Sequence, residues 1–142
     1  MRNESAAPPV SAPHRQVASF EDLIAWQKAR SLTRAITELT SKPPVSRKFA
    51  FRDQIERAAV SVMSNIAEGY ERGSRAEFHH MLSISKGSCA EVRSLLYVAL
   101  DAGYVSEAQF QALMGHATET ARVIGALRAS VGRQRDENKA AL

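Results

Sequence analysis

The chain has few of the features that define disulfide-rich, secreted, membrane or β-sheet proteins. Cys89 is its single cysteine, which excludes an internal disulfide and is typical of a reducing cytoplasm. No apolar run approaches the roughly 20 residues that span a bilayer, and the N-terminus lacks the apolar core of a signal peptide. Strand-like alternation and Asn-Gly or Asp-Gly turns are also absent. We therefore expect a cytoplasmic protein with no membrane contact and no β-sheet.

Motifs for catalysis and cofactor binding are missing as well. The sequence has no Gly-rich phosphate loop and no nucleophile elbow. His79 and His80 are adjacent, so they point to different faces of a helix and cannot chelate one metal as i,i+4 histidines do. A di-iron helical bundle needs Glu-x-x-His on two helices, and only Glu77 with His80 has that spacing. We expect no enzymatic activity, no metal and no cofactor.

The composition indicates one globular domain between two polar tails. Of the 142 residues, 44% are hydrophobic and 24% charged, which suffices for a single core. Pro8, Pro9 and Pro13 stand among small and polar residues, and this composition predicts a disordered N-terminal tail over 1–18. The polar segment 133–142 is expected to fray. The domain is therefore predicted to span 19–132.

Capping signals and apolar periodicity indicate four helices in this domain. Ser19, Ser74 and Ser106 each stand three residues before an Asp, Glu or Gln, the pattern of a capping box. Pro43 and Pro44 cannot continue a helix, so the first helix ends before them. The predicted helices are 20–41, 47–70, 75–102 and 107–131. Four helices with short connections predict an all-α, antiparallel up-and-down four-helix bundle.

Polar residues interrupt the apolar stripe of the second predicted helix at Arg57, Asn65 and Glu68. An unpartnered buried polar group costs about 1–3 kcal/mol, so a second helix or a ligand must supply partners. If the second and third helices form a hairpin, Arg57 lies within a turn of Ser88 and Glu91. We expect an Arg57–Glu91 ion pair inside the bundle. These five residues form a predicted structural polar network, with ligand binding as the alternative.

Small residues occupy the middle of the third predicted helix, in the run Gly87-Ser88-Cys89-Ala90. Helix propensity disfavours glycine there, so the run predicts close approach of a neighbouring helix. Cys89 also lies on the apolar stripe, where a buried and inert thiol is the default.

The net charge of +4 permits acidic partners such as nucleic acid. The third and fourth predicted helices are each neutral, so the excess lies elsewhere. Free N–H groups and the helix dipole favour phosphate at helix N-termini. The candidate nucleic-acid-binding residues gather at the two ends of the predicted bundle. They are Lys42, Arg47, Lys48 and Arg52 at one end and Arg72 and Arg75 at the other.

Ordinary surface pairing is the alternative interpretation of these charges. Glu68–Arg72, for example, is spaced i,i+4 and is typical of a solvated helix face. No aromatic-rich basic stripe that could stack bases is visible in the sequence. Any nucleic-acid binding should therefore be independent of base sequence.

A second apolar face on the first predicted helix contains Ile24 and Trp26. Both lie off the stripe formed by Leu32, Ile36 and Leu39. Bulky aromatic residues are enriched at protein interfaces, so Ile24 and Trp26 are candidates for an interface between subunits. Packing of Trp26 within its own bundle is the alternative.

Several of these segments together resemble a known family. The segments read FEDLIAWQKA at 20–29, QIERAAVS at 54–61, SNIAEG at 64–69 and KGS at 86–88, followed by Glu91. In order and spacing they resemble the four-helix-bundle family of 23S rRNA intervening-sequence proteins, also called S23. The resemblance extends from about residue 20 to residue 127. The family is named after reading frames inside insertions of bacterial 23S rRNA genes, which does not establish a ribosomal role.

The resemblance also implies an assembly and partners. A related branch, the accessory variability determinants of diversity-generating retroelements, forms pentameric barrels that bind a reverse transcriptase and nucleic acid. The resemblance therefore implies a homopentamer with basic surfaces that could bind RNA or DNA, and a reverse transcriptase if the gene lies in a retroelement. We expect a non-enzymatic oligomeric scaffold that binds nucleic acid or ribonucleoprotein through basic bundle ends. The alternative is a protein–protein interaction assembly with no nucleic-acid role.

Overall fold

Four α-helices make up the protein, as the computed structural model shows for residues 16–140, with side chains through 138. They are α1 (Ile24–Thr40), α2 (Phe49–Glu71), α3 (Arg75–Asp101) and α4 (Glu107–Ala140). Two short 3₁₀ turns, η1 (Phe20–Asp22) and η2 (Val45–Arg47), precede α1 and α2. Within this described range there is no strand. The predicted all-α four-helix fold is confirmed, while most of the predicted N-terminal tail lies outside the described residues.

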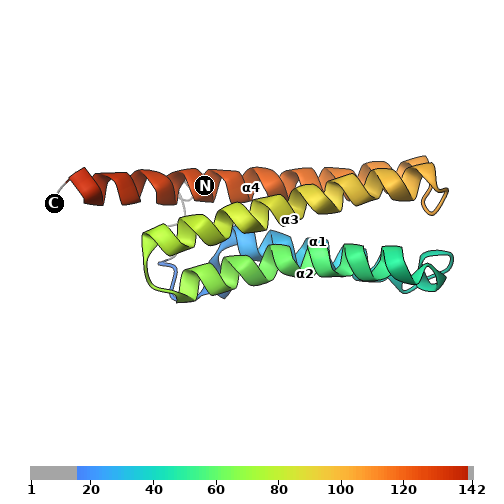
Figure 1. Ribbon diagram of the computed structural model, residues 1–142, viewed down its shortest axis with the longest axis horizontal. Helices are drawn as coiled ribbons and strands as arrows, with labels where there is room; N and C mark the ends of the chain where they lie inside the picture. The colour runs from blue at the N-terminus through green and yellow to red at the C-terminus, as the bar shows by residue number, and fades with distance from the viewer. Residues whose placement is uncertain (1–15, 141–142) are drawn as a thin grey trace, which may run out of the picture.

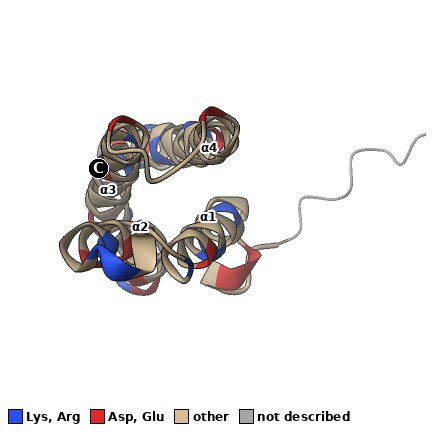
Figure 2. Cartoon of the chain, turned by 90° about the vertical axis from the view of Figure 1, so that its right-hand side faces the viewer, with Lys and Arg blue, Asp and Glu red and all other residues tan. Residues whose placement is uncertain are grey.

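Consecutive helices run antiparallel and pack side by side (Figure 1). Seen end-on, α1 and α2 form one pair and α3 and α4 the other, and α2 packs against α3 (Figure 2). α1 contacts both α2 and α4, which closes the bundle. None of the helices in residues 16–140 is both long and apolar enough to cross a membrane.

Local capping explains where α3 and α4 begin. The Ser74 hydroxyl accepts a hydrogen bond from the Glu77 backbone N–H at 3.1 Å. Ser106 and Gln109 cap each other's backbone N–H groups at 3.1 and 2.8 Å, a complete capping box. Gly73, with φ of 80°, follows Arg72, the C-cap of α2, in the left-handed conformation, where other residues would be strained.

The first helix starts later than the capping pattern predicts. The Asp22 carboxylate accepts the backbone N–H of Ser19 at 3.2 Å, but this pair caps the η1 turn. Leu23 then takes an extended conformation with ψ of 124°, which separates η1 from α1. The buried Leu23 side chain packs in the core, so tertiary packing fixes this break.

Apolar side chains from all four helices form one core. Leu and Ile residues dominate it, and each contributes about 1.5–3 kcal/mol on full burial. The largest fully buried aliphatic side chains are Leu32, Ile36, Ile55, Ile66, Leu82, Leu96 and Ile124. Every buried side-chain nitrogen and oxygen in the described part of the chain has a hydrogen-bond partner. The Thr40 hydroxyl, for example, donates to Glu56 Oε1 at 2.6 Å.

The fourth helix is longer than predicted. It continues through the expected stop at Gly132 to Ala140, whereas the sequence predicted a helix that ends at residue 131 and a frayed tail over 133–142. Gly132 is buried, and a β-carbon there would lie 3.2 Å from the His79 ring. Arg75 of α3 also donates to the side chain of Gln134. These contacts with α3 support the helix beyond the glycine, and its end projects past the α2–α3 turn (Figure 1).

The close approach between α2 and α3 lies at a different glycine from the predicted one. A β-carbon at Gly69 would lie only 2.7 Å from the β-carbon of Met81. Gly87, in contrast, has nothing within 4 Å of the same position and faces solvent. The small-residue run at 87–90 therefore does not mark the tightest contact, which Gly69 provides instead.

Candidate nucleic-acid interface

Two members of the predicted polar network lie together between α2 and α3. Asn65 Nδ2 donates to the backbone oxygen and the hydroxyl of Ser61, each at 2.8 Å. The Ser61 and Ser88 hydroxyls are hydrogen-bonded at 2.8 Å. Asn65 and Ser88 are half-buried. Ser61, which the sequence reasoning missed, thus links Asn65 to Ser88 across the helix pair.

The expected ion pair between Arg57 and Glu91 is not formed. Both side chains are exposed, and no salt bridge joins them in the described part of the chain, although they line one pocket of about 460 Å³. Glu91 instead accepts a long hydrogen bond of 3.5 Å from Gln54. Glu68 is exposed as well and pairs with Arg72 at 2.6 Å. Small contact residues such as Ala58 occupy the interface, so these longer charged side chains face solvent.

The predicted basic cluster Lys42, Arg47, Lys48 and Arg52 lies at the α1–α2 end of the bundle. Lys42 pairs with the exposed Glu38 at 3.7 Å. Arg52 donates to the backbone oxygen of Ser46 at 3.0 Å and pairs with Asp53 at 3.3 Å. Arg47 and Lys48 are exposed and form no ion pair within the described residues. Two of the four cations therefore have no acidic partner in this structure.

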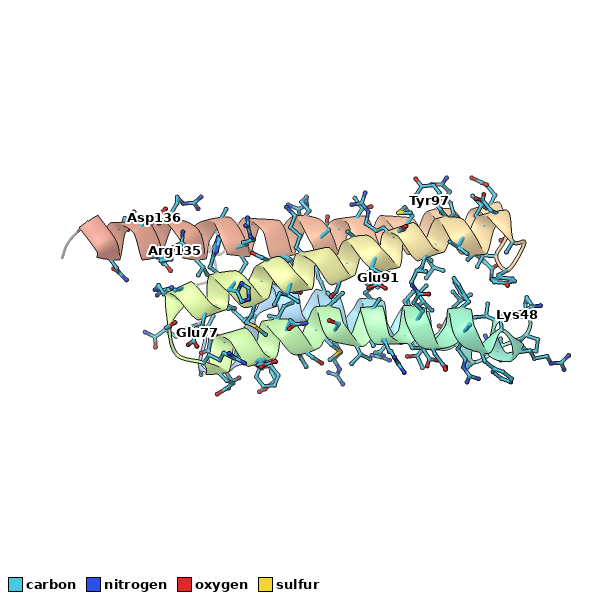
Figure 3. All side chains as sticks on the ribbon, viewed as in Figure 1. Lys48, Glu77, Glu91, Tyr97, Arg135 and Asp136 are labelled. Atoms are coloured by element: carbon cyan, nitrogen blue, oxygen red, sulfur yellow. The ribbon has the colours of Figure 1, made fainter. Side chains whose placement is uncertain are left out.

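An exposed aromatic ring accompanies these cations. Phe49, the first residue of α2, is 63% exposed. The Arg52 guanidinium lies 4.9 Å from the centre of its ring. Lys48, labelled in Figure 3, is the N-cap of α2, and no side chain caps this helix N-terminus. Phe49 was not predicted from the sequence, because Phe51, two residues on, completes the apolar stripe.

The two basic residues predicted at the opposite end have polar partners. Arg72 pairs with Glu68 at 2.6 Å and with Glu77 at 3.9 Å, and the hydrogen bond to Glu68 raises the pKa of Arg72. Arg75 is bound to Gln134 of α4. Arg72 and Arg75 thus connect helix ends and lie far from the α1–α2 end.

A second basic surface follows the outer line of contact between α3 and α4. We call it the basic seam, formed by Lys86 and Arg93 of α3 and Arg128 and Arg135 of α4. Lys86 Nζ lies 3.8 Å from the β-carbon position of Gly125 on α4, and Arg128 Nε donates to Ser83 Oγ of α3 at 2.7 Å. This surface was not predicted from the sequence, because the total charge of each helix is close to zero.

His79 lies beside the seam with its ring against Gly132. Burial lowers the pKa of His79, and the positive charges of Arg128 and Arg135 lower it further. Both effects favour the neutral form of the imidazole.

Cys89 lies in the buried core. The Cys89 thiol is buried, contacts the backbone oxygen of Ala117 at 3.3 Å, and burial raises its pKa to about 11. In the part of the chain that the structure describes, no group of three His, Cys, Asp or Glu side chains could hold a metal.

The two candidate interface residues of α1 differ in exposure. Trp26 is half-buried, with its ring 5.2 Å from that of Phe20 in an edge-on arrangement, so it packs within its own bundle. Ile24 is 63% exposed.

Comparison with known proteins places this bundle in a family. Residues 21–126 match the family described as 23S rRNA-intervening sequence protein. The chain belongs to this family. The match covers the α1–α2 end and the polar network, whereas Arg128 and Arg135 of the seam lie beyond it.

A solved structure shares the fold. It is the crystal structure of a protein with unknown function from the S23 ribosomal protein family of Bacteroides thetaiotaomicron. The two superpose with a TM-score of 0.68 at 21% identity, over 74% of this chain and 98% of that one. No protein with a curated description matches the chain.

Proposed function

We propose that this family member is a non-catalytic protein that binds the phosphate backbone of nucleic acid through the α1–α2 end. One observation carries the proposal. Arg47, Lys48 and Phe49 stand exposed side by side at a helix N-terminus that no side chain caps.

Each part of this end suits a nucleic-acid strand. Arg47 and Lys48 can pair with phosphates, and the first backbone N–H groups of α2 add hydrogen-bond donors and a positive dipole end. The exposed Phe49 ring offers a face on which a base can stack. Phosphate contacts and stacking both tolerate any base, so binding should be independent of sequence.

A salt-titrated binding assay tests this function. Fluorescence anisotropy of labelled RNA and DNA should show binding at about 50 mM salt that weakens steeply as salt rises. Arg47→Glu with Lys48→Glu should reduce the affinity at least tenfold. The matched control is Arg30→Glu with Arg34→Glu on α1, which changes the net charge equally at two exposed positions. Absence of binding at low salt, or equal loss in both variants, would refute the proposal.

Self-association is the second part of the proposal. Large apolar side chains stand exposed on separate helices, among them Ile24 at 63% and Val60 at 49%. Burial of such residues favours assembly of several copies, and the family resemblance implies a pentamer. Light scattering after size-exclusion chromatography should give the mass of an oligomer, and Ile24→Glu should reduce it. A protein that assembles but binds no nucleic acid would instead be a protein-interaction scaffold.

A further inference from the structure

Three contacts fix how α3 and α4 align along the basic seam. His79 lies against Gly132, Arg128 bonds to Ser83, and Lys86 lies over Gly125. His79, Lys86 and Arg93 are spaced by seven residues, so they share one face of α3. The cations of the two helices therefore follow one line on the surface.

This line is long enough to follow several nucleotides. Arg135 lies one helical turn beyond Gly132, and Arg93 lies four turns beyond His79 in the other direction. At a rise of 1.5 Å per residue, the distance from Arg135 to Arg93 is about 25 Å. Lys86 and Arg128 lie between them.

The acidic residues of α3 and α4 lie mostly off this line. Glu91 is on the α2 side of α3, where Gln54 donates to it (Figure 3). Glu119 pairs with Arg122 at 2.7 Å. Asp136 pairs with Arg135 at 3.3 Å and is the one acid within the described residues that neutralises a seam cation. The seam therefore keeps a net positive charge even though each helix is nearly neutral.

An aromatic ring stands at one end of the seam. Tyr97 lies four residues beyond Arg93 and is 56% exposed. Its ring is 5.0 Å from that of Phe110 at an angle of 58°, so a neighbour on α4 holds it in place. Figure 3 labels Tyr97 and Arg135 at the two ends of this line. Cations followed by a supported, exposed ring are typical of single-strand binding.

We propose that the basic seam binds one single strand of nucleic acid, with its phosphates on Lys86, Arg93, Arg128 and Arg135 and a base on Tyr97. The inference deepens the proposed function and rests on it, because it adds a second surface and names the ligand class. A duplex keeps its bases stacked on each other, so it can use the cations but not Tyr97.

The test uses the full chain with fluorescein-labelled oligo-dT of 12 nucleotides and with a 12-base-pair duplex. Anisotropy is measured over a series of salt concentrations. The seam variant is Lys86→Gln with Arg93→Gln, the end variant is Arg47→Gln with Lys48→Gln, and the charge-matched control is Arg30→Gln with Arg34→Gln. All six positions are exposed, so the fold should be retained.

The salt dependence separates the surfaces. For the single strand, loss of two phosphate contacts in the seam variant should bring the negative slope of log K against log salt about 1.4 closer to zero, at roughly 0.7 per contact. Tyr97→Ser should weaken single-strand binding about fivefold to a hundredfold, with the slope unchanged and duplex binding unaffected. Ultraviolet cross-linking of a bromouridine strand to the unmodified protein should map to Tyr97.

Each contrary result has its own meaning. If only the end variant changes the slope and no cross-link reaches Tyr97, the seam proposal fails while the proposed function stands. If no variant differs from the control, both fail. If poly-glutamate displaces the strand as effectively as oligo-dT does, the seam recognises acidic chains in general and the nucleic-acid assignment is overturned.

Discussion

The two basic surfaces of this bundle are built in different ways. At the α1–α2 end, Arg47 is the last residue of the η2 turn, Lys48 follows it directly before α2, and both side chains are exposed. Along the seam, Lys86 of α3 and Arg128 of α4 come from two helices and become neighbours only when those helices pack. The first surface is a property of a short segment, whereas the second depends on the tertiary structure. The net charge of a helix therefore says little about the charge of its faces.

The first prediction concerns the close approach of α2 and α3 at Gly69, which lies outside both basic surfaces. Gly69→Ala should lower the free energy of unfolding by about 1–3 kcal/mol, because its β-carbon overpacks the α2–α3 contact at Met81. Urea denaturation measures the change. Nucleic-acid affinity should be retained below the transition, since neither basic surface includes this contact. A more stable variant would contradict the close approach.

The second prediction concerns a substitution that should weaken nucleic-acid binding at the seam and leaves all four seam cations in place. Gly125→Glu should place a carboxylate next to Lys86, whose Nζ lies 3.8 Å from the β-carbon position. Single-strand affinity should fall about tenfold, on the order of 1.4 kcal/mol, as expected for opposing charge at a binding surface. Anisotropy with oligo-dT measures it.

Gly115→Glu is the matched control, because this glycine of α4 has nothing within 4 Å of its β-carbon position. Both variants gain helix propensity, so their stability should not fall. Equal loss of binding in the two would mean that net charge, and not the seam, determines affinity.

The third prediction concerns pH. Burial is the main reason that the folded-state pKa of His79 lies below its usual value of 6.5. The positive charges of Arg128 and Arg135 lower this pKa further, and His80 adds a smaller decrease. The negative charge of Asp136 raises the pKa and so partly opposes the shift. The unfolded chain therefore binds more protons just below pH 6.5. This contribution to stability is complete above about pH 6.5 and is lost as the pH falls through the lower folded value.

Thermal melts between pH 7.5 and 5 should show this loss, and His79→Gln should reduce it. A strand on the seam adds negative charge near His79, so binding should tighten as the pH falls over the same range. An unchanged pH profile in His79→Gln would contradict the packed position of the ring.

The smallest expected effect is at Gly87. Gly87→Ala should raise the free energy of unfolding by about 0.5–1 kcal/mol, since alanine favours the helix and nothing lies within 4 Å to obstruct it. Denaturation under the conditions used for Gly69→Ala measures it. If Gly87→Ala instead destabilised the protein, a neighbouring helix would lie close to Gly87, as the sequence predicted.

Sequence patterns predicted those features of the protein that depend on residues close together in the chain. The caps at Ser74 and Ser106 placed the starts of α3 and α4 within a residue, and the motifs of the family gave the fold. The cluster containing Arg47 and Lys48 was visible because its members are close together in the chain.

Features that depend on packing were not predictable in this way. Arg57 was predicted to lie inside the bundle because its spacing fits a helical hairpin. In the structure its neighbour Ala58 is buried and Arg57 faces solvent. Gly132 resembled a helix stop, yet contact with His79 carries α4 past it. The seam was hidden because opposite charges on other faces of α3 and α4 cancel in a sum over each helix.

The salt dependence of single-strand binding tests the account most directly. If Lys86, Arg93, Arg128 and Arg135 all contact phosphates, log K for oligo-dT should fall with log salt at a slope of about −2.8 or steeper. Lys86→Gln with Arg93→Gln should bring this slope about 1.4 closer to zero. Binding that is insensitive to salt, or an unchanged slope in this variant, would contradict the account.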